Sequence, residues 1–236
     1  MCGRYLRRSS KQGITEAFEL PRDPTHISLS PSDYNIAPTT HQPVIRNNRN
    51  TGERELVLMR WGMVPQFANS ISEFNGISTI NARADALAEK PMWRIPFETR
   101  RCLVPADGFY EWKPRLSMTE SSSRRTKQPY AFTMADPAAA PFAFAGIWSA
   151  WKDPATNDWL QSFAIITTEA NELMAPIHNR MPVILQPEDY DRWLNRERKS
   201  LTSTSDLPLD LLRPYSSQAL QTIPCNPIEA QAASSL

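Results

Sequence analysis

The chain has few of the residues that mark several common protein classes. Only 7 of its 236 residues are glycine and 3 are cysteine, whereas 21 are proline. Because Cys2, Cys102 and Cys225 cannot all pair within one chain, we do not expect a disulfide framework, and the count suits a reducing compartment. The many prolines indicate short elements joined by stiff turns.

Long apolar runs and a strong charge imbalance are also missing. No apolar stretch approaches the length of a membrane-spanning helix, and residues 1–8 lack the apolar centre of a secretion signal. We therefore expect no membrane association, and a location in the cytoplasm beside the nucleoid in a bacterium or in the nucleus in a eukaryote. The net charge is +1, so a nucleic acid would have to be held by a local cluster of the 26 lysine and arginine residues.

Several catalytic signatures are absent as well. The chain has no glycine-rich phosphate loop, no Gly-x-Ser-x-Gly turn and no His-Glu-x-x-His motif. No pair of cysteines or histidines has the spacing of metal ligands, so we expect neither a metal nor a cofactor.

Short runs of aromatic and β-branched residues dominate what is present, and these runs are typical of strands. The expected strands cover 43–46, 55–61, 100–105, 108–112, 130–134, 142–148, 162–167 and 181–185, and the expected helical segments follow Ser10 and cover 81–90, 169–174 and 188–194. Because strands and helices do not alternate regularly, the pattern predicts a single α+β domain with a curled, barrel-like, mainly antiparallel β core and short flanking helices. We place this domain at 2–228, with a solvated loop at 115–128 and a frayed tail at 229–236.

Residue 2 offers the most distinctive chemistry. Removal of Met1, which is common before a small residue, would leave Cys2 with a free α-amine beside its thiol. The ordinary pKa values of these groups are about 7.7–8.0 and about 8.5, close to neutral pH. An aldehyde could form a Schiff base with the amine, and the sulfur could then close a five-membered thiazolidine ring. Position alone does not distinguish this from a cysteine that merely stands second in the chain.

Three other polar residues are candidates for hydrogen bonding or proton transfer. Glu111 shares a strand face with Phe109, so it is either a partly desolvated acid–base group or an edge residue facing water. His178 could shuttle protons near neutral pH or satisfy a carbonyl at a helix end. Asn81 suits a helix N-cap at the start of segment 81–90, and Pro91 is expected to end that helix.

Arginines lie close to two of these candidates. Arg4, Arg7 and Arg8 follow Cys2, and Arg83 stands at the expected helix start, where an anion is favoured. A solvated face is the default interpretation of such a run, and contact with phosphate is the alternative.

Six ordered blocks together resemble the SRAP family (SOS response-associated peptidase), whose members are also called abasic-site processing proteins. The blocks are MCGRY at 1–5, YNIAP at 34–38, RWGMVP at 60–65, INARAD at 80–85, RRCLVPADGFYEW at 100–112 and HNRMPVIL at 178–185. They follow the family order across nearly the whole chain, which is more specific than any one short motif.

The resemblance implies an enzyme that forms a covalent thiazolidine crosslink with abasic sites in single-stranded DNA, as a monomer, and protects them from strand cleavage during the DNA damage response. Family members are also described as peptidases that act on their own N-terminus, and some have lyase chemistry. The implied catalytic residues are Cys2, Asn81, Glu111 and His178. The implied DNA contacts are Arg4, Asn35, Pro38, Phe67, Arg83 and Arg180, with Phe67 near the place where relatives often carry a tryptophan wedge.

Two other functions remain open at this point. An N-terminal-nucleophile peptidase or amidase would use the Cys2 thiolate and form an acyl intermediate. A non-covalent reader of single-stranded DNA would not need Cys2 at all.

Overall fold

The computed structural model describes residues 2–21, 27–30, 32–74, 77–114, 127–195 and 207–225. The strands are β1 (Arg4–Arg7), β2 (Asp33–Ile36), β3 (His41–Asn47), β4 (Arg54–Trp61), β5 (Asn81–Arg83), β6 (Arg101–Ala106), β7 (Gly108–Pro114), β8 (Lys127–Met134), β9 (Phe142–Lys152), β10 (Trp159–Glu169), β11 (Arg180–Pro182), β12 (Ile184–Leu185) and β13 (Leu220–Pro224). The α-helices are α1 (Lys11–Ala17), α2 (Pro91–Thr99) and α3 (Tyr190–Leu194), and the 3-10 helices are η1 (Ile71–Phe74), η2 (Ile77–Thr79), η3 (Ala84–Ala86), η4 (Pro187–Asp189), η5 (Leu209–Leu211) and η6 (Ser217–Ala219).

The larger sheet closes into a barrel. Strands β10, β4, β3, β6 and β9 pair in that order, and β9 pairs again with β10. Strands β5 and β11 add to β10, while β12 adds to β9. β10 runs parallel to β4 and β5 and antiparallel to β9 and β11, so the sheet is mixed.

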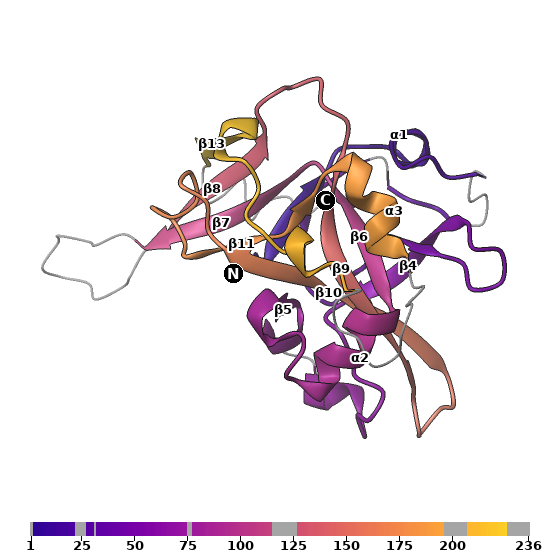
Figure 1. The fold of residues 1–236 in the computed structure, drawn as a ribbon. Coiled ribbons are helices and arrows are strands. Elements are labelled where there is room, and N and C mark those ends of the chain that lie inside the picture. The colour runs from indigo at the N-terminus through magenta and orange to yellow at the C-terminus, as the bar shows by residue number, and fades with distance from the viewer. Residues whose placement is uncertain are drawn as a thin grey trace, which may run out of the picture.

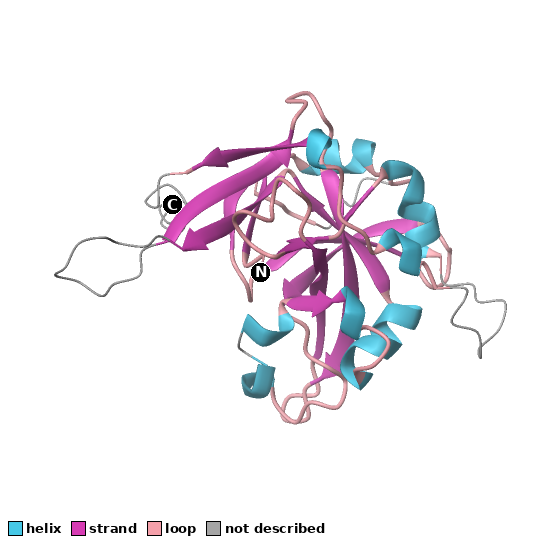
Figure 2. Ribbon diagram, turned by 60° about the vertical axis from the view of Figure 1, so that its left-hand side comes forward, coloured by secondary structure: helices cyan, strands magenta, loops and turns pink. Residues whose placement is uncertain are grey.

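A smaller sheet, in the order β13-β8-β7-β1-β2, is antiparallel throughout. In Figure 1 its strands β7, β8 and β13 lie on the side of the molecule opposite α1 and α3. Figure 2 shows the short helices gathered along one side of the strands. The predicted single α+β domain, with a curled, mainly antiparallel core, is therefore confirmed. No helix in the described part of the chain is long and apolar enough to span a membrane.

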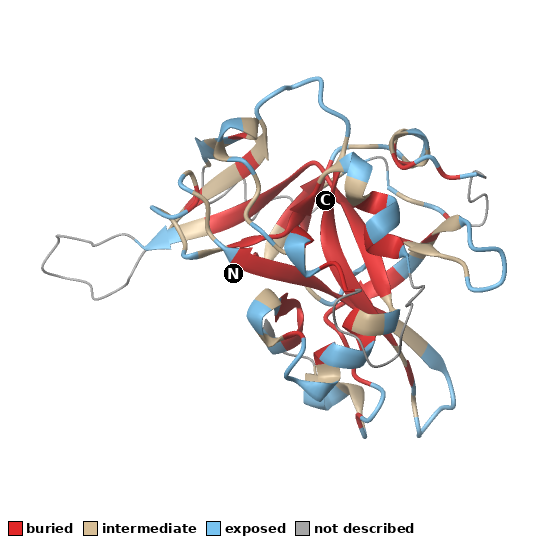
Figure 3. Cartoon of the chain, in the orientation of Figure 1, coloured by how far each residue is buried: buried red, intermediate tan, exposed pale blue. Residues whose placement is uncertain are grey.

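Strand alternation divides most of the core into two large hydrophobic clusters, and a third, small cluster consists of Val64, Ala68 and Trp151. Along β6, Leu103 packs in one cluster, whereas Cys102 and Val104 pack in the other. The first cluster also holds residues from the helices, including Phe97 and Trp193. The second cluster includes residues of the smaller sheet, and Figure 3 shows how completely the central strands are buried.

Two helix predictions are confirmed and a third is wrong. The predicted helix 188–194 corresponds to η4 and α3, which together cover 187–194. Helix α1 follows Ser10, whose side chain accepts a hydrogen bond from the backbone N–H of Gly13 as an N-cap. Segment 81–90 is not one helix, because Asn81–Arg83 forms a parallel ladder with β10 that overrides local propensity, and only Ala84–Ala86 is helical, as the 3-10 helix η3. Pro91 begins α2 instead of ending a helix, since its fixed φ suits the first helical turn.

Three smaller expectations also need correction. Segment 169–174 begins at the last residue of β10 and continues into turns, and the predicted strand 181–185 is split into β11 and β12. Positions 127 and 128 of the predicted loop belong to β8, which pairs with β7. The rest of that loop, 115–126, and the predicted tail 229–236 lie outside the described residues.

Candidate active site

Cys2 lies buried at the start of the chain, just before β1. The strand β1 is held between β2 and β7, and this places Cys2 in the second hydrophobic cluster together with Tyr5. Only 1% of Cys2 is exposed. Burial raises the pKa of its thiol well above the ordinary value, and the nearby charge of Glu111 raises it further. The thiol is therefore neutral at physiological pH.

Asn81 fixes the backbone of residue 2. It lies on β5 opposite Ile165 of β10, and its Nδ2 donates a hydrogen bond to the Cys2 carbonyl oxygen at 2.8 Å. The predicted role of Asn81 as a helix N-cap is wrong, because the residue is in a strand. Its Oδ1 is buried and has no hydrogen-bond partner among the described residues. Asn81 thus binds the backbone of residue 2 through Nδ2, and its Oδ1 is available to accept another hydrogen bond.

Glu111 is buried beside the same segment. Strand β7 lies between β1 and β8, so Glu111 is not on an edge strand, and only 4% of it is exposed. The pairing of Arg4 with Tyr110, continued by one residue, brings Glu111 opposite Gly3. The structure thus favours a desolvated Glu111 over one that faces water.

A close approach of β7 and β8 supports this position. A Cβ atom at Gly108 would lie 2.7 Å from the Phe132 carbonyl oxygen, closer than side chains tolerate. Glycine is therefore required at this point of the ladder that carries Glu111.

His178 is half-buried in the segment before β11. Its Nδ1 accepts the backbone N–H of Arg180 at 3.0 Å. The same Nδ1 lies 3.2 Å from the Arg180 carbonyl oxygen, to which it would donate in the other tautomer. The tautomer in which Nδ1 accepts the Arg180 N–H carries its proton on Nε2, which can then donate. Met174 and Ile177 pack in the same hydrophobic cluster as Cys2, so the chain that leads to His178 lies against the Cys2 side of the core.

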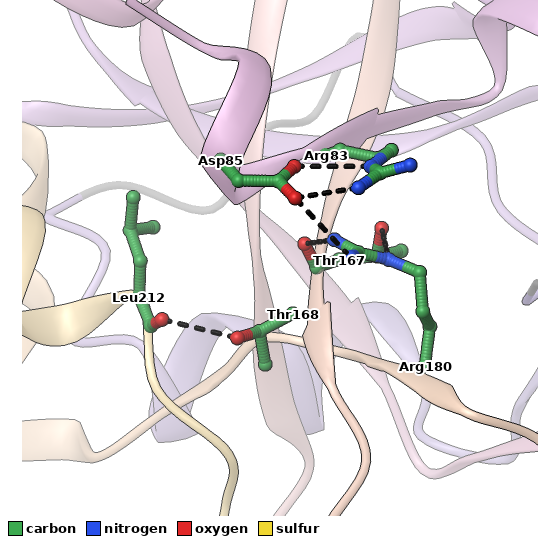
Figure 4. Close-up of polar contacts among 6 residues, drawn as sticks. All are labelled: Arg83, Asp85, Thr167, Thr168, Arg180 and Leu212. Carbon is green, nitrogen blue, oxygen red and sulfur yellow. Dashed lines mark hydrogen bonds and ion pairs between the residues drawn. The ribbon is translucent and has the colours of Figure 1, made fainter.

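Arg83 and Arg180 meet at the surface, on either side of β10. Arg83 of β5 pairs with Thr167 of β10, and Arg180 of β11 pairs with Glu169 of β10. Arg83 is the last residue of β5 and directly precedes the 3-10 helix η3, so it lies at the start of a three-residue 3-10 helix and not of the longer helix predicted over 81–90. Asp85 lies between the two arginines (Figure 4).

The three arginines that follow Cys2 differ in burial: Arg7 is buried, whereas Arg4 and Arg8 reach the surface. Arg7 is buried and donates to the carbonyl oxygens of Ser9 and Ser30, so a solvated face is the wrong description for it. Arg8 is exposed, and Arg4 is half-buried with its guanidinium donating to the Gly3 carbonyl at 2.8 Å. Of these residues, Arg4 lies nearest to Cys2 in the chain.

The other predicted DNA contacts differ in accessibility. Asn35 is buried in β2, and Pro38 is half-buried just after it. Phe67 is 65% exposed, which is unusual for a large aromatic side chain. The Tyr110 hydroxyl donates to the Tyr34 carbonyl at 2.9 Å and so ties this region to β7.

The structure thus gathers Cys2, Asn81 and Glu111 into one buried group, which we call the Cys2 site. It gathers Arg83, Asp85 and Arg180 into an exposed group, which we call the arginine cluster. Asp85 was not among the predicted residues, because the helix expected at 81–90 concealed it. The chain turns from β5 into η3 directly after Arg83, and this turn brings the Asp85 carboxylate back to the Arg83 guanidinium.

This buried N-terminal cysteine, set on a barrel of mixed strands, defines a protein of the SRAP class. The family model described as SOS response associated peptidase (SRAP) matches residues 1–228, and the chain belongs to this family. It is 38% identical over 221 residues to the abasic site processing protein YoqW of Bacillus subtilis, covering 94% of this chain and 90% of that protein.

Similarity extends to eukaryotic proteins and to solved structures. The abasic site processing protein HMCES of Xenopus tropicalis is 31% identical over 198 residues, covering 74% of this chain and 56% of that protein. A crystal structure of a protein from Bacteroides thetaiotaomicron superposes with a TM-score of 0.79 at 26% identity, covering 98% of this chain and 94% of the other.

Proposed function

We propose that this protein, after loss of Met1, uses Cys2 to form a covalent thiazolidine crosslink with abasic sites in single-stranded DNA. The observation that carries the proposal is the buried Cys2 site, in which Asn81 binds the backbone of residue 2 and Glu111 lies close enough to affect the thiol. The relatives named as abasic site processing proteins support the same substrate.

The reaction needs an amine, a thiol and groups that move protons. The Cys2 amine adds to C1 of the open-chain sugar, and the resulting carbinolamine takes up a proton and loses water to give an iminium ion. The Cys2 sulfur then adds to the same carbon, and its proton passes to the Glu111 carboxylate and on to solvent. The balance is one aldehyde and one aminothiol giving one thiazolidine and one water.

Each remaining group has a role in this scheme. The buried Oδ1 of Asn81 would accept a hydrogen bond from the new α-amine, while Nδ2 keeps the carbonyl in place. His178, with its proton on Nε2, would donate to the sugar oxygen as the ring opens. The closed ring leaves no iminium, so β-elimination and strand breakage are suppressed.

The raised pKa of the Cys2 thiol favours this chemistry over that of a thiolate peptidase. A peptidase nucleophile must be a thiolate when it attacks, and burial beside Glu111 opposes that state. Attack by the amine needs no thiolate, because the sulfur reacts only after the more electrophilic iminium has formed.

The surface beside the Cys2 site suits a single strand of DNA. Arg83 stands two residues after Asn81 on the same face of β5, so a phosphate bound there would lie near residue 2. An abasic nucleotide has no base to unstack, so its extrusion costs less than the few kcal/mol of an intact nucleotide. We infer that the arginine cluster and the exposed Phe67 hold the strand while the sugar enters the Cys2 site.

A denaturing gel with an abasic oligonucleotide tests the proposal. The protein without Met1 should give a heat-stable adduct whose mass is that of protein plus oligonucleotide minus one water, and Cys2→Ala should give none. An adduct of unchanged yield in Cys2→Ala would refute the assignment, and an acylated Cys2 after incubation with peptides would point to the peptidase instead.

A further inference from the structure

The carboxylate of Asp85 bridges two cationic side chains. Its Oδ1 accepts from Arg83 Nε at 3.0 Å, and its Oδ2 accepts from Arg83 Nη2 at 2.5 Å. The same Oδ2 lies 3.9 Å from Nη1 of Arg180. Figure 4 shows the carboxylate lying between the two arginine side chains. Two parallel N–H···O contacts of this kind are also how arginine binds a phosphate.

Arg180 keeps its position without help from Asp85. Its Nη2 donates to the Thr167 carbonyl oxygen at 2.6 Å, and its Nε donates to Thr167 Oγ1 at 3.3 Å. Its side chain is only 15% exposed. The guanidinium is therefore fixed on β10, and orienting Arg180 is not the reason for the carboxylate.

Asp85 is also free to move away. Its side chain is 56% exposed, and it stands at the edge of a cavity of about 370 Å³ that is also lined by Arg180, Glu169, Thr168, Leu209 and Leu212. The rim of this cavity is held by a hydrogen bond from Thr168 Oγ1 to the Leu212 carbonyl (Figure 4). Ion pairs exposed to water contribute little to stability, so exchanging the carboxylate for another anion costs little.

We propose that Asp85 is a placeholder for a DNA phosphate. In the free protein its carboxylate occupies the anion site between Arg83 and Arg180, and a backbone phosphate beside the abasic nucleotide displaces it. The inference rests on the proposed function, and it assigns to Asp85 the control of the affinity for single-stranded DNA. Because the carboxylate of Asp85, together with that of Glu169 in the same cavity, offsets the positive charge of Arg83 and Arg180, a strand without an abasic site is released quickly, whereas an abasic site is retained covalently.

The test compares Asp85→Asn with the unaltered protein in binding to intact single-stranded DNA, measured by fluorescence anisotropy at several salt concentrations. Asp85→Asn adds one net positive charge where the phosphate binds, which is equivalent to one more neutralised phosphate and, on a single strand, to a change of about −0.7 in the slope of log K against log salt. The variant should therefore bind about fivefold more tightly at about 0.1 M salt, with a slope steeper by about 0.7. The gain should largely vanish when Arg83 is also replaced by alanine.

Asp191→Asn is the matched control. Asp191 is also an exposed carboxylate in an ion pair, with Arg54 Nη2 at 2.7 Å, but it lies on α3. This variant should leave DNA affinity unchanged, and thermal unfolding should show that both variants fold.

Weaker binding by Asp85→Asn would mean that the carboxylate orients Arg83, and unchanged binding would mean that no phosphate enters the site; either result overturns the proposal. These affinities are measured on intact DNA and do not depend on crosslinking. If the unaltered protein forms no adduct with abasic DNA, the proposed function fails separately.

Discussion

The Cys2 site and the arginine cluster share strand β5 but differ in their relation to water. Cys2, Asn81 and Glu111 are 1%, 6% and 4% exposed, respectively. The side chains of Arg83 and Asp85, only a few residues further along, are 58% and 56% exposed. One strand thus runs from a desolvated reaction site to a solvated binding surface.

This difference in exposure separates the proposed reaction at the Cys2 site from the proposed DNA binding at the arginine cluster. Where water is excluded, a charge or hydrogen bond acts strongly on its neighbours, and a missing partner is costly. At the surface, water and salt weaken each contact, so ions can exchange rapidly. We therefore expect variants of the Cys2 site to change reaction rate, and variants of the exposed residues to change affinity.

The largest expected effect comes from Glu111→Gln. This change keeps the shape but removes the carboxylate that would accept the thiol proton, and a general acid–base group contributes about 10²–10⁴-fold to rate. Crosslinking to an abasic oligonucleotide, followed over time on denaturing gels, should slow by about 100-fold or more.

Glu55→Gln is the control for this change, because Glu55 pairs with Arg46 on the β3–β4 ladder, far along the chain from residue 2. It should crosslink at the normal rate. If Glu111→Gln instead weakened the binding of intact DNA and left the rate of the bound complex unchanged, the separation of the two regions would be lost.

Asn81→Ala should have the next largest effect. It removes the donor to the Cys2 carbonyl and leaves a buried acceptor unsatisfied, a cost of about 2 kcal/mol. We expect a loss of stability of this order in thermal unfolding and a crosslinking rate lower by about 30-fold, since about 1.4 kcal/mol corresponds to tenfold.

Gln128→Ala removes a comparable bond, from Gln128 Nε2 to the Cys225 carbonyl at 2.7 Å, in the smaller sheet. It should lower stability but not the crosslinking rate. A rate that falls equally in both variants would show that Asn81 acts only through general stability.

These two regions were not equally predictable from the sequence. Runs of β-branched and aromatic residues were sufficient to predict most barrel strands, because such residues fit a buried pleated surface. The second pairing of β9 with β10, which closes the barrel, depends on long-range contacts that no local pattern reveals.

The secondary structure around Asn81 was predicted wrongly, and the reason is physical. Local propensity in segment 81–90 favours a helix, yet β10 offers a parallel ladder and makes 81–83 a strand. The resemblance identified Asn81 and Arg83, but the helix interpretation concealed the turn from β5 into η3 that brings Asp85 to Arg83. The chemical residue types could thus be predicted, whereas the geometry that joins them could not.

Phe67→Ala tests the exposed, proposed DNA-binding surface without changing its charge. Stacking of a base on an aromatic side chain contributes about 1–3 kcal/mol, so intact single-stranded DNA should bind about tenfold more weakly at every salt concentration. Trp159→Ala is the control, since Trp159 is similarly exposed, at 67%, on β10. Equal losses in both variants would indicate non-specific apolar binding and not a stacking contact at Phe67.

Arg83→Ala should give the smallest effect, and one that salt removes. Losing one phosphate contact on a single strand lowers affinity by about fivefold at about 0.1 M salt and reduces the salt slope by about 0.7. Stability should hardly change, because the pair with Asp85 is exposed to water and such pairs contribute little to stability.

Arg7→Ala is the control for Arg83→Ala, because it removes a buried arginine in place of an exposed one. Arg7 is buried and its guanidinium donates to two backbone carbonyls, so its loss should destabilise the fold by about 2 kcal/mol or more. Thermal unfolding and anisotropy, measured on both variants, would then separate a structural arginine from a binding one. A fall in stability for Arg83→Ala equal to that for Arg7→Ala would contradict the division between buried and exposed charge.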